Sequence, residues 1–463
     1  MKQYDAIVIG TGQAGPTLAS RLAGSGLHTA IIERGRFGGT CVNTGCIPTK
    51  TLVASARVAH GVRRAAEYGI VTSGPVQVDM KRVMQRKADI VRKSTEGVER
   101  WLKGTDHLDV IEGHARFTGP HTLQVGSDSF TADRIFIDVG TRAGVPPIQG
   151  IGDVKFLTNT DMLELDHVPE HLVIIGGSYI GLEFGQMFRR FGSDVTIVER
   201  MPHLISREDP DVSDAVRRIL EAEGLRVHTG AECIAAAPHD GTFRITLDCN
   251  DETREVIGSH LLIATGRRPN TDDLGLDQAG IETDARGFIP VNDELMTSVD
   301  GVWALGDVNG RGAFTHTAYN DHEIVADNLL TGASRRVSDR ILAYALYIDP
   351  PLARVGLSET AVRASGREAL VARRPMTRVS RAVEKGETQG FMKILVDANT
   401  EEILGFMILG VGGDEVVHSV LDIMYARVPY TVIRNAVHIH PTVAELIPTL
   451  LGDLKPMAAS AND

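Results

Sequence analysis

The stretch GGTCVNTGCIPTK, residues 38–50, holds two of the chain's four cysteines, Cys41 and Cys46. A disulfide requires Cα atoms within about 7 Å, and a regular helix would hold residues five apart farther than that. The backbone between the two cysteines is therefore predicted to be distorted, which Asn43 and Gly45 tolerate. Pro48 suits the first turn of a helix that we predict from about Thr49 to Glu67.

The two cysteines are predicted to differ chemically. Cys46 falls at or near the positive N-terminal end of the predicted helix, where a thiolate is stabilised, and Cys41 is left as the freer attacking sulfur. This asymmetry is typical of a reversible redox dithiol. A structural disulfide is the alternative, but such bonds are uncommon in a reducing compartment. Cys233 and Cys249 have no partner at a useful spacing and are expected to be ordinary thiols.

A glycine-rich turn precedes the dithiol, between two predicted strands at Ala6–Ile9 and His28–Ile32. The turn reads GTGQAG at residues 10–15, a helix is predicted from it to about Ala23, and Glu33 closes the second strand. In a dinucleotide-binding unit the glycines permit a tight turn and close approach of the pyrophosphate, and the acid receives ribose hydroxyls. The strand, the helix and the spacing to the acid together predict a dinucleotide site.

The same unit recurs at residues 172–199. A strand at 172–175 leads into GGSYIG at 176–181, and a strand at Val195–Val198 ends on Glu199. The first glycine and the acid are each displaced by 166 residues, from 10 to 176 and from 33 to 199. Ser178 replaces the middle glycine and slightly crowds the pyrophosphate approach. Two registered units predict two dinucleotide sites, and beside a dithiol they suggest a relay from nicotinamide to flavin to disulfide.

The rest of the chain divides into recognisable segments. A strand at Phe130–Val139 and a turn-rich segment at 145–150 indicate a boundary near residue 150. Two more strand-and-glycine signals follow, IATGRRPN at 263–270 and GVWALGDVN at 301–309. From about residue 338, alternating apolar segments and two helical stretches indicate a separate α+β domain; the apolar segments are Phe391–Val396 and Ile403–Leu409.

Composition excludes some classes of partner. The chain has 463 residues, 43% of them hydrophobic, and a net charge of −12, which argues against nucleic acid or an anionic membrane as a main partner. Met1–Asp5 leads directly into the first strand, so we expect no signal peptide, and no apolar run approaches membrane-span length. We expect a cytoplasmic enzyme.

A histidine motif, HIHPTVAE at residues 438–445, stands near the C-terminus. His440 before a proline, with Glu445 five residues on, has the pattern of an oriented general base. A helix-entry segment with incidental histidines is the alternative that spacing leaves open.

Together these residues resemble the FAD-dependent pyridine nucleotide–disulfide oxidoreductases, which include lipoamide dehydrogenase, glutathione reductase and mercuric reductase. The resemblance covers nearly the whole chain, with five motifs in the expected order. It implies an α/β fold with two Rossmann-like dinucleotide-binding domains, for FAD and NAD(P), and a C-terminal α+β dimerisation domain. The expected boundaries are 1–150 and 266–335 for the FAD-binding domain, 151–265 for the NAD(P)-binding domain, and 336–463 for the dimerisation domain.

The resemblance implies the catalytic roles. Cys46 matches the sulfur against the flavin and Cys41 the interchange sulfur that meets the substrate. Lys50 matches the lysine beside flavin N5, with Glu183 as its partner. A base and its orienting acid, matched by His440 and Glu445, are supplied across the interface of a homodimer to the other subunit's interchange sulfur.

The resemblance also implies the cofactor contacts and no resident metal site. Asp307 matches the acid that holds the flavin ribityl chain, and Tyr179 the aromatic gate where nicotinamide enters. The full set of implied dinucleotide contacts is Gly10, Gly12, Gly15, Glu33, Gly39, Thr40, Lys50, Gly140, Arg267, Asp307, Gly176, Gly177, Tyr179, Ile180, Glu199 and Gly266.

The wording GGTCVNTGCIPTKTLVASA is most similar to the mercuric-reductase-like branch, including its relatives in reactive-chlorine resistance. Mercuric reductases carry a vicinal cysteine pair near the C-terminus, whereas no cysteine here follows Cys249. We also expect no counterpart of their N-terminal metal-binding extension, and the chain keeps a histidine base that they lack. Because soft Hg(II) is handed between successive thiolates, efficient mercury detoxification is not expected.

The expected function is transfer of a hydride from NAD(P)H through FAD to the Cys41–Cys46 disulfide, and on to a disulfide, quinone or metal-ion acceptor. Glu199 favours NADH because a carboxylate accepts ribose hydroxyls and repels a 2′-phosphate, although Arg200 and Arg207 could weaken that preference. The alternatives are a dihydrolipoyl dehydrogenase acting on a protein-bound lipoyl group, and a redox-sensing stress-response flavoprotein.

Overall fold

The computed structural model describes residues 1–249 and 252–458; the side chains of Cys233 and Cys249, expected to be ordinary thiols, lie outside the described part. The first glycine turn belongs to a seven-stranded sheet. Its strand order is β3 (Leu108–Glu112), β2 (Thr29–Glu33), β1 (Lys2–Ile9), β6 (Asp128–Ile137), β5 (Thr122–Val125) and β4 (Ala115–Gly119), with β17 (Val302–Ala304) also paired to β6. Strands β3, β2, β1, β6 and β17 are parallel.

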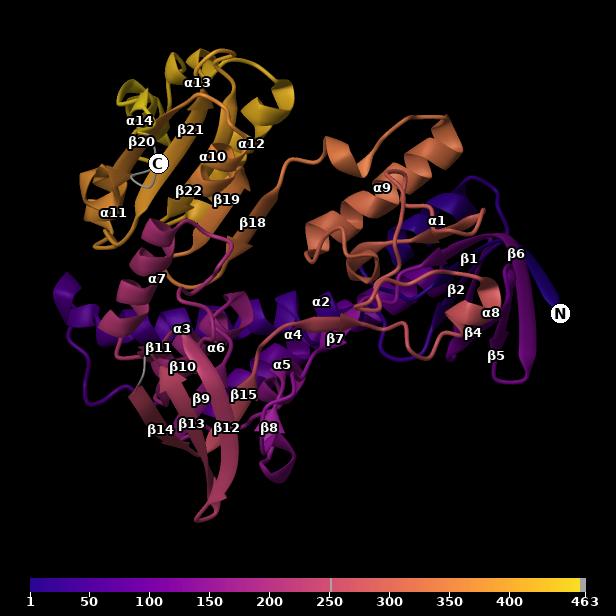
Figure 1. Cartoon of the computed structure of the whole chain (residues 1–463), viewed down its shortest axis with the longest axis horizontal. Helices are drawn as coiled ribbons and strands as arrows, with labels where there is room; N and C mark the ends of the chain where they lie inside the picture. The colour runs from indigo at the N-terminus through magenta and orange to yellow at the C-terminus, as the bar shows by residue number, and fades with distance from the viewer. Residues whose placement is uncertain (250–251, 459–463) are drawn as a thin grey trace.

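Apolar residues on both faces explain why this sheet is covered by helices. Ile7, Val8, Ile31 and Phe136 are fully buried, as expected for parallel strands with both faces covered. Helices α1 (Gly15–Gly24) and α9 (Thr315–Thr331) pack together, and the cluster that covers one face contains residues of both. In Figure 1 this layered unit lies on the right.

The second glycine turn belongs to a five-stranded parallel sheet. Its order is β11 (Arg226–His228), β10 (Asp194–Val198), β9 (His171–Ile175), β15 (His260–Ile263) and β8 (Phe156–Leu157). Helix α6 (Tyr179–Phe191) follows β9, α5 (Asn159–Met162) follows β8 and α7 (Pro210–Ala222) follows β10. A three-stranded antiparallel sheet, β12 (Ala231–His239), β13 (Thr242–Cys249) and β14 (Glu252–Gly258), packs against the parallel sheet through a shared core.

The C-terminal part is a six-stranded antiparallel sheet with helices. The strand order is β18 (Ala343–Leu346), β19 (Leu352–Gly356), β22 (Ile403–Leu409), β21 (Phe391–Asp397), β20 (Ala369–Pro375) and β23 (Lys455–Pro456). Its helices are α10 (Glu359–Ala364), α11 (Ser380–Glu384), α12 (Gly413–Ala426), α13 (Thr431–Arg434) and α14 (Ile447–Gly452). The two apolar segments predicted as strands are the fully buried strands β21 and β22. The predicted α/β class with two Rossmann-like units and a C-terminal α+β unit is thus confirmed.

Buried ion pairs join the second sheet to the C-terminal sheet. Arg354 Nε of β19 donates to both carboxylate oxygens of Glu208 (3.0 and 2.9 Å). Lys393 Nζ of β21 lies 2.9 Å from carboxylates of both Asp209 and Asp211. Removal of one partner from a buried pair costs about 3–5 kcal/mol because the other charge remains buried. These pairs therefore fix how the two units pack.

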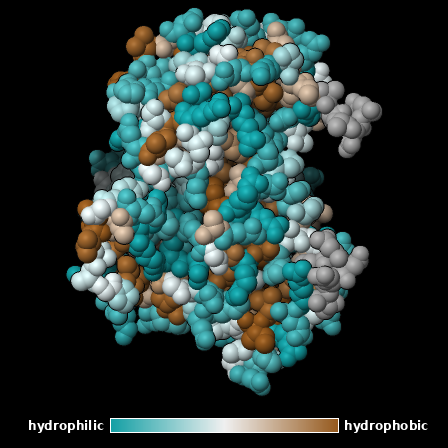
Figure 2. All heavy atoms as spheres, turned by 90° about the vertical axis from the view of Figure 1, so that its left-hand side faces the viewer, coloured by the Kyte–Doolittle hydropathy of each residue, from teal (hydrophilic) through white to brown (hydrophobic). Residues whose placement is uncertain are grey.

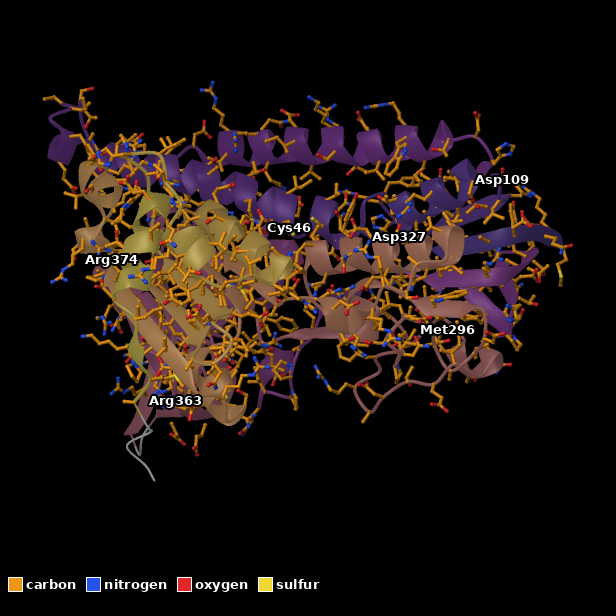
Figure 3. The ribbon with its side chains drawn as sticks, turned by 90° about the horizontal axis from the view of Figure 1, so that it is seen from above. Cys46, Asp109, Met296, Asp327, Arg363 and Arg374 are labelled. Carbon is orange, nitrogen blue, oxygen red and sulfur yellow. The ribbon has the colours of Figure 1, made fainter. Side chains whose placement is uncertain are left out.

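Two long helices run between these units. Helix α3 (Cys46–Arg63) packs on α4 (Met80–Lys103) and on α6. A two-stranded pair, β7 (Thr141–Ala143) and β16 (Arg267–Pro269), connects the end of the first sheet to the chain leaving the second, and α8 (Leu276–Ala279) packs on β4. Viewed from above, Cys46 lies near the middle of the molecule, between Asp109 of the first sheet and Arg374 of the C-terminal sheet (Figure 3).

The helix after the cysteines begins earlier than predicted. We expected it from about Thr49 to Glu67, whereas α3 spans Cys46–Arg63 and a 3₁₀ turn follows at Ala65–Tyr68. The first four N–H groups of a helix have no partner within it, so proline is tolerated throughout the first turn. Pro48 is therefore the third residue of the helix, and Cys46 is its first.

The surface is predominantly polar on the face shown in Figure 2, where hydrophobic side chains form small groups separated by hydrophilic ones. Among the described residues, none of the helices is both long and apolar enough to cross a membrane.

Candidate active site

The two cysteines are brought together by a break between short helix α2 (Gly39–Asn43) and helix α3. Cys41 lies in α2 and Cys46 begins α3. Gly45, at the break, has φ −133° and ψ −115°, and a Cβ there would lie 2.9 Å from Thr40 O and 3.3 Å from the Cys41 Cα. Contacts this short exclude a side chain, so glycine is required for the fold-back.

Asn43 acts differently from our expectation that its own backbone would be distorted. It is the last helical residue of α2, and its side chain donates to the carbonyls of Phe37 (2.9 Å) and Gly39 (3.0 Å). The side-chain amide oxygen of Asn43, Oδ1, accepts from Thr95 Oγ1 of α4 (3.1 Å). Asn43 therefore holds the cysteine loop through its side chain.

The two sulfurs are free thiols that interact and have opposite acidities. The hydrogen bond from Cys41 lowers the pKa of Cys46 to about 6; Thr315 and the charge of Lys50 act in the same direction, and burial opposes them. The same hydrogen bond, with burial, raises the pKa of Cys41. Near neutral pH the reduced pair is therefore a Cys46 thiolate beside a Cys41 thiol, the asymmetry predicted from the helix N-terminus.

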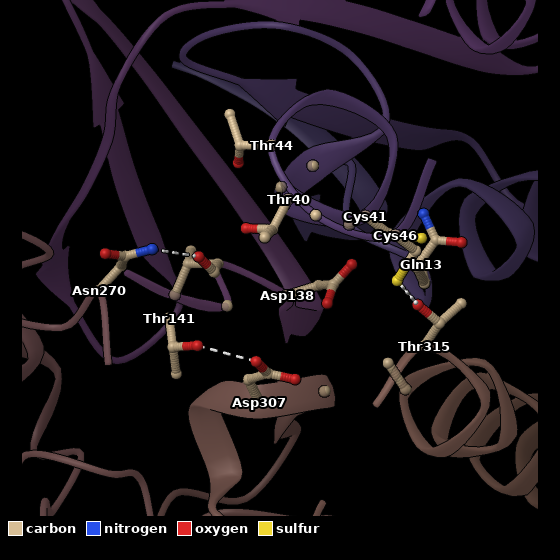
Figure 4. Close-up of a pocket in the computed structure, with 18 of the residues that line it drawn as sticks. Gln13, Thr40, Cys41, Thr44, Cys46, Asp138, Thr141, Asn270, Asp307 and Thr315 are labelled. Carbon is tan, nitrogen blue, oxygen red and sulfur yellow. Dashed lines mark hydrogen bonds between the residues drawn. The ribbon is translucent and has the colours of Figure 1, made fainter. Parts of the chain in front are cut away.

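Thr315, the first residue of α9, faces Cys46. Its Oγ1 lies 3.2 Å from the Cys46 sulfur, and Figure 4 shows the contact from the opposite wall of the cavity. A thiolate can only accept, so the threonine hydroxyl donates when Cys46 is ionised.

Replacing Thr315 with valine is expected to raise the pKa of Cys46 from about 6 by about one to two pH units. Hydrogen bonds to charged groups contribute about 1.5–3 kcal/mol, and about 1.4 kcal/mol corresponds to one pH unit. Cys46 is a thiol below its pKa, so the thiolate absorbance of the reduced variant should appear at higher pH during a titration. Thr315→Ser keeps the hydroxyl and should titrate like the wild type; an unchanged midpoint in the valine variant would mean that Thr315 does not stabilise the thiolate.

Lys50 and Glu183 form the predicted pair one helical turn beyond Cys46. Lys50 Nζ donates to both carboxylate oxygens of Glu183 (3.0 and 2.7 Å) and lies over the ring of Tyr347, 4.7 Å from its centroid. Glu183 is 4% exposed and also accepts from the Tyr347 backbone N–H (2.9 Å). The lysine charge is thereby fixed beside the dithiol.

A cavity of about 610 Å³ extends from the cysteines to the first glycine turn. The predicted residues that line it are Gly10, Gly12, Glu33, Gly39, Thr40, Cys41, Cys46, Lys50, Gly140, Tyr179, Ile180, Glu183, Arg267 and Asp307. Large cavities of this kind typically hold cofactors.

The glycine turn has the shape of a cradle for a pyrophosphate. A Cβ on Gly10 would lie 2.3 Å from Asp138 O, and one on Gly12 would lie 2.7 Å from Asp138 Oδ2. Gly15 has no room either, because its Cβ would meet the Gly10 carbonyl oxygen at 2.3 Å. Glu33 accepts from Thr11 N and Gly35 N (2.9 and 2.8 Å), so its carboxylate closes the same turn. The residues present therefore fit a dinucleotide such as FAD.

Asp307 lies at the far side of the cavity. Its Oδ2 accepts from Thr141 Oγ1 (2.8 Å), which accepts from Arg267 Nε (2.7 Å). Figure 4 shows the hydrogen bond between Thr141 and Asp307 in the cavity lining. The hydrogen bond from Asn270 to the Val139 carbonyl lies nearby. An acid positioned by a threonine and an arginine is suited to bind hydroxyl groups.

Sequence reasoning did not identify several residues of this cavity, among them Asp138, Thr141, Thr315 and Tyr347. Asp138 follows β6, is fully enclosed, and accepts from Gly15 N (2.7 Å); burial raises the pKa of its carboxyl well above the usual range. Its position at the carboxyl end of a parallel strand was the available signal, because ligands of such sheets bind there. Thr315 carried no comparable signal, since an isolated threonine at the start of a helix is common and carries no chemistry of its own.

The second glycine turn repeats the geometry of the first. A Cβ on Gly176 would lie 2.4 Å from Ala264 O, and Glu199 accepts from Gly177 N (2.6 Å) and Met201 N (2.7 Å). Gly266 has φ +140° just after β15, at the same end of the sheet. Ser178, the residue before α6, makes no side-chain capping hydrogen bond. Tyr179, the next residue, lines the first cavity, so the two dinucleotide units meet at this tyrosine.

His440 does not line the cavity. Its Nδ1 lies 3.0 Å from each carboxylate oxygen of Glu445, which is the oriented-base geometry expected from the motif. The side chain of His440 is 72% exposed, and Val437 and Ile439 beside it are 100% and 80% exposed. Exposed apolar residues around an oriented histidine are typical of a surface that another protein chain covers.

Comparisons with known proteins agree with this geometry. Residues 4–321 match the family model "Pyridine nucleotide-disulphide oxidoreductase", and residues 342–451 match its dimerisation domain. The chain is 36% identical to a probable pyridine nucleotide-disulfide oxidoreductase RclA of Escherichia coli, over 98% of this chain and 100% of that one. It is 33% identical to a dihydrolipoyl dehydrogenase of Thermus scotoductus (96% of each chain) and 32% identical to a mercuric reductase of Bacillus cereus (90% of this chain, 66% of that one).

A solved structure is also similar. The Cu(II) complex of the HOCl-induced flavoprotein disulfide reductase RclA of Escherichia coli superposes with a TM-score of 0.89 at 36% identity, covering 98% of this chain and 99% of the other.

Proposed function

This chain belongs to the pyridine nucleotide–disulphide oxidoreductase family, and on that premise we propose that it is an NADH-dependent reductase that passes electrons through Cys41 and Cys46 to a disulfide acceptor. Its cofactors are FAD and NAD(P)H, and its dimerisation domain supports a homodimer. The observation that carries the proposal is the acid–base asymmetry of the dithiol combined with the His440–Glu445 pair.

Bound FAD supplies two-electron transfer from NAD(P)H to the disulfide. In the reduced protein, Cys41 attacks one sulfur of the acceptor, whose S–S bond breaks and whose first thiol leaves with a proton. The Cys46 thiolate then attacks the Cys41 sulfur, which re-forms the Cys41–Cys46 disulfide and releases the second sulfur as a thiolate that takes a proton from solvent. One disulfide acceptor is thus reduced to two thiols for each NADH oxidised.

The partner subunit's His440 is proposed to take the proton from Cys41 and give it to the leaving thiol, because Cys41 itself remains protonated near neutral pH. Lys50 and Glu183 hold a fixed charge beside Cys46, and Thr315 and Lys50 stabilise its thiolate. We also propose that the first glycine turn and Asp307 bind FAD, and that the second glycine turn binds the nicotinamide cofactor.

The domain division is proposed on the same basis. The strands of the first sheet come from residues 2–137 and 302–304, those of the parallel second sheet from 156–263, and those of the third from 343–456. Boundaries near 150, 265 and 335 separate these sets.

Reduction of a metal ion is a second candidate, favoured by the Cu(II) complex of the RclA relative. Anaerobic turnover of the holoenzyme with NADH or NADPH separates the candidates when lipoamide, glutathione disulfide, quinones, Cu(II) and Hg(II) are compared. We expect the fastest turnover with a disulfide. Turnover with Cu(II) alone would favour the second candidate, and little turnover with every acceptor would indicate a redox sensor.

Replacing Glu199 with glutamine is expected to shift the nicotinamide preference from NADH toward NADPH by about 10- to 100-fold. The amide keeps an acceptor oxygen but removes the charge that repels a 2′-phosphate, and hydrogen bonds to charged groups contribute about 1.5–3 kcal/mol. The ratio of kcat/KM for the two cofactors measures the shift. Glu33→Gln, the same change in the first unit, is the matched control and should leave that ratio unchanged; an unshifted ratio in Glu199→Gln would assign the preference to other residues.

A further inference from the structure

Two histidines face each other at the amino end of the second sheet, whereas its glycine turn lies at the carboxyl end of the strands. His260 is the first residue of β15, and His167 lies in the segment between α5 and β9. Their Nε2 atoms are 3.2 Å apart, and their rings meet edge on with centroids 5.2 Å apart. Dinucleotides bind at the carboxyl ends of parallel strands, whereas this pair lies at the amino ends, so it is separate from the cofactor sites.

The hydrogen bond on the other ring nitrogen fixes the tautomer of His167. Its Nδ1 lies 3.2 Å from Asp166 Oδ1. An ionised carboxylate can only accept a hydrogen bond, so Nδ1 carries the proton. A neutral His167 therefore presents an unprotonated Nε2 with a free lone pair.

The same holds for His260. Its Nδ1 lies 3.0 Å from Ser259 Oγ, and the single proton of that hydroxyl is donated to the His171 carbonyl (3.1 Å). The serine must then accept from His260, which places the proton on Nδ1 and leaves Nε2 free. Two nitrogen lone pairs consequently face each other across 3.2 Å.

Two facing lone pairs repel unless a cation lies between them. We propose that His167 and His260 form a binding site for a divalent transition-metal ion of the class that prefers imidazole, such as Zn(II) or Cu(II). With metal–nitrogen bonds of about 2.0–2.1 Å, a separation of 3.2 Å corresponds to an N–metal–N angle of about 100°, close to tetrahedral. Asp166 serves as the outer carboxylate that orients a metal-binding histidine.

The surroundings of the pair suit an open metal site. His167 is about half exposed, which leaves an entry path. Among the described residues, no group of three or more His, Cys, Asp or Glu side chains is arranged around a metal position. Water therefore completes the coordination, and the expected effect is to link β15 to the segment before β9.

Calorimetric titration of the oxidised holoenzyme with Zn(II) tests the site, because a Cys41–Cys46 disulfide offers no thiolate to compete. Each of His167→Gln and His260→Gln should bind one Zn(II) fewer per subunit than the wild type. His203→Gln is the matched control, and this variant should bind as the wild type does. His203 is a half-exposed histidine on the same unit, 3.9 Å from a carboxylate oxygen of Asp214, and it has no histidine partner among the described residues.

Two further readouts make the test independent of stoichiometry. Asp166→Asn should weaken Zn(II) binding by about 10- to 100-fold, the usual effect of removing an outer-shell partner. Electron paramagnetic resonance of bound Cu(II) should lose nitrogen couplings in His260→Gln. Equal stoichiometry and affinity in the wild type and in both histidine variants would overturn the proposal. If the two rings share a proton, and Zn(II) binding is the same in the wild type and in the histidine variants, then a proton and not a metal ion lies between the rings, which would also overturn the proposal.

Discussion

Replacing Cys46 with serine is expected to lower NADH-dependent turnover of a disulfide acceptor by about 10⁴-fold or more, within the range for loss of a catalytic nucleophile. The variant keeps Cys41 and can still attack the acceptor. It lacks the thiolate that resolves the mixed disulfide, because the serine hydroxyl does not ionise near neutral pH. The reaction should therefore stop after one attack.

The products distinguish the two sulfurs. Mass spectrometry of Cys46→Ser treated with an acceptor disulfide should find one acceptor thiol attached to Cys41, whereas Cys41→Ser should form much less adduct. Cys233→Ser is the control, since the sequence gives that cysteine no partner, and it should retain full turnover. An adduct that accumulates on Cys46 of Cys41→Ser, and not on Cys41 of the other variant, would reverse the assigned roles.

The sequence predicted the parts of this site that depend on local spacing. The two glycine turns and their acids could be found because the acid follows the first glycine by 23 positions in each unit, from 10 to 33 and from 176 to 199, and the units recur with a fixed offset. The structure repeats even their hydrogen bonds, with Glu33 accepting from Thr11 and Gly35, and Glu199 from Gly177 and Met201. The Lys50–Glu183 contact came from the family resemblance alone, since no local pattern links residues so far apart.

The remaining parts could not be predicted because they depend on tertiary contacts. Thr315 reaches Cys46 from a helix 269 residues away in the chain, and Asp138 reaches Gly15 across 123 residues. The start of α3 was misplaced for a different reason: Pro48 marks the first turn of a helix but not its first residue. The pairing of His167 with His260 likewise arises only where the loop before β9 meets the start of β15.

The second large effect concerns His440, whose role depends on dimerisation. The residue does not line the cavity of its own subunit, and it lies among exposed apolar side chains on the dimerisation domain. An isologous contact through that surface would place two such histidines at two dithiols at once. We therefore expect the active species to be a dimer in light scattering, and an active monomer at assay concentration would contradict this arrangement.

His440→Ala is expected to slow disulfide turnover by about 10²-fold or more, the usual cost of losing a general acid–base. Cys41 needs a base because the Cys46 thiolate and burial raise its pKa, and the departing thiol needs a proton. Reduction of a quinone or metal ion has no leaving thiol, so it should fall far less. Glu445→Gln should give a smaller loss, because the histidine remains but is held by a weaker partner.

His438→Ala provides the matched control for the last prediction. His438 is an exposed histidine two residues before His440. In the described part of the chain, the hydrogen-bond partner of its ring is the Ala436 carbonyl (3.3 Å). Its removal should change neither turnover nor dimerisation. As the pH rises, hydroxide can take the proton of the Cys41 thiol in place of the missing histidine. The loss of disulfide turnover in His440→Ala should therefore become smaller as the pH increases. Equal losses with every acceptor, at every pH, would instead mean that His440 is structural.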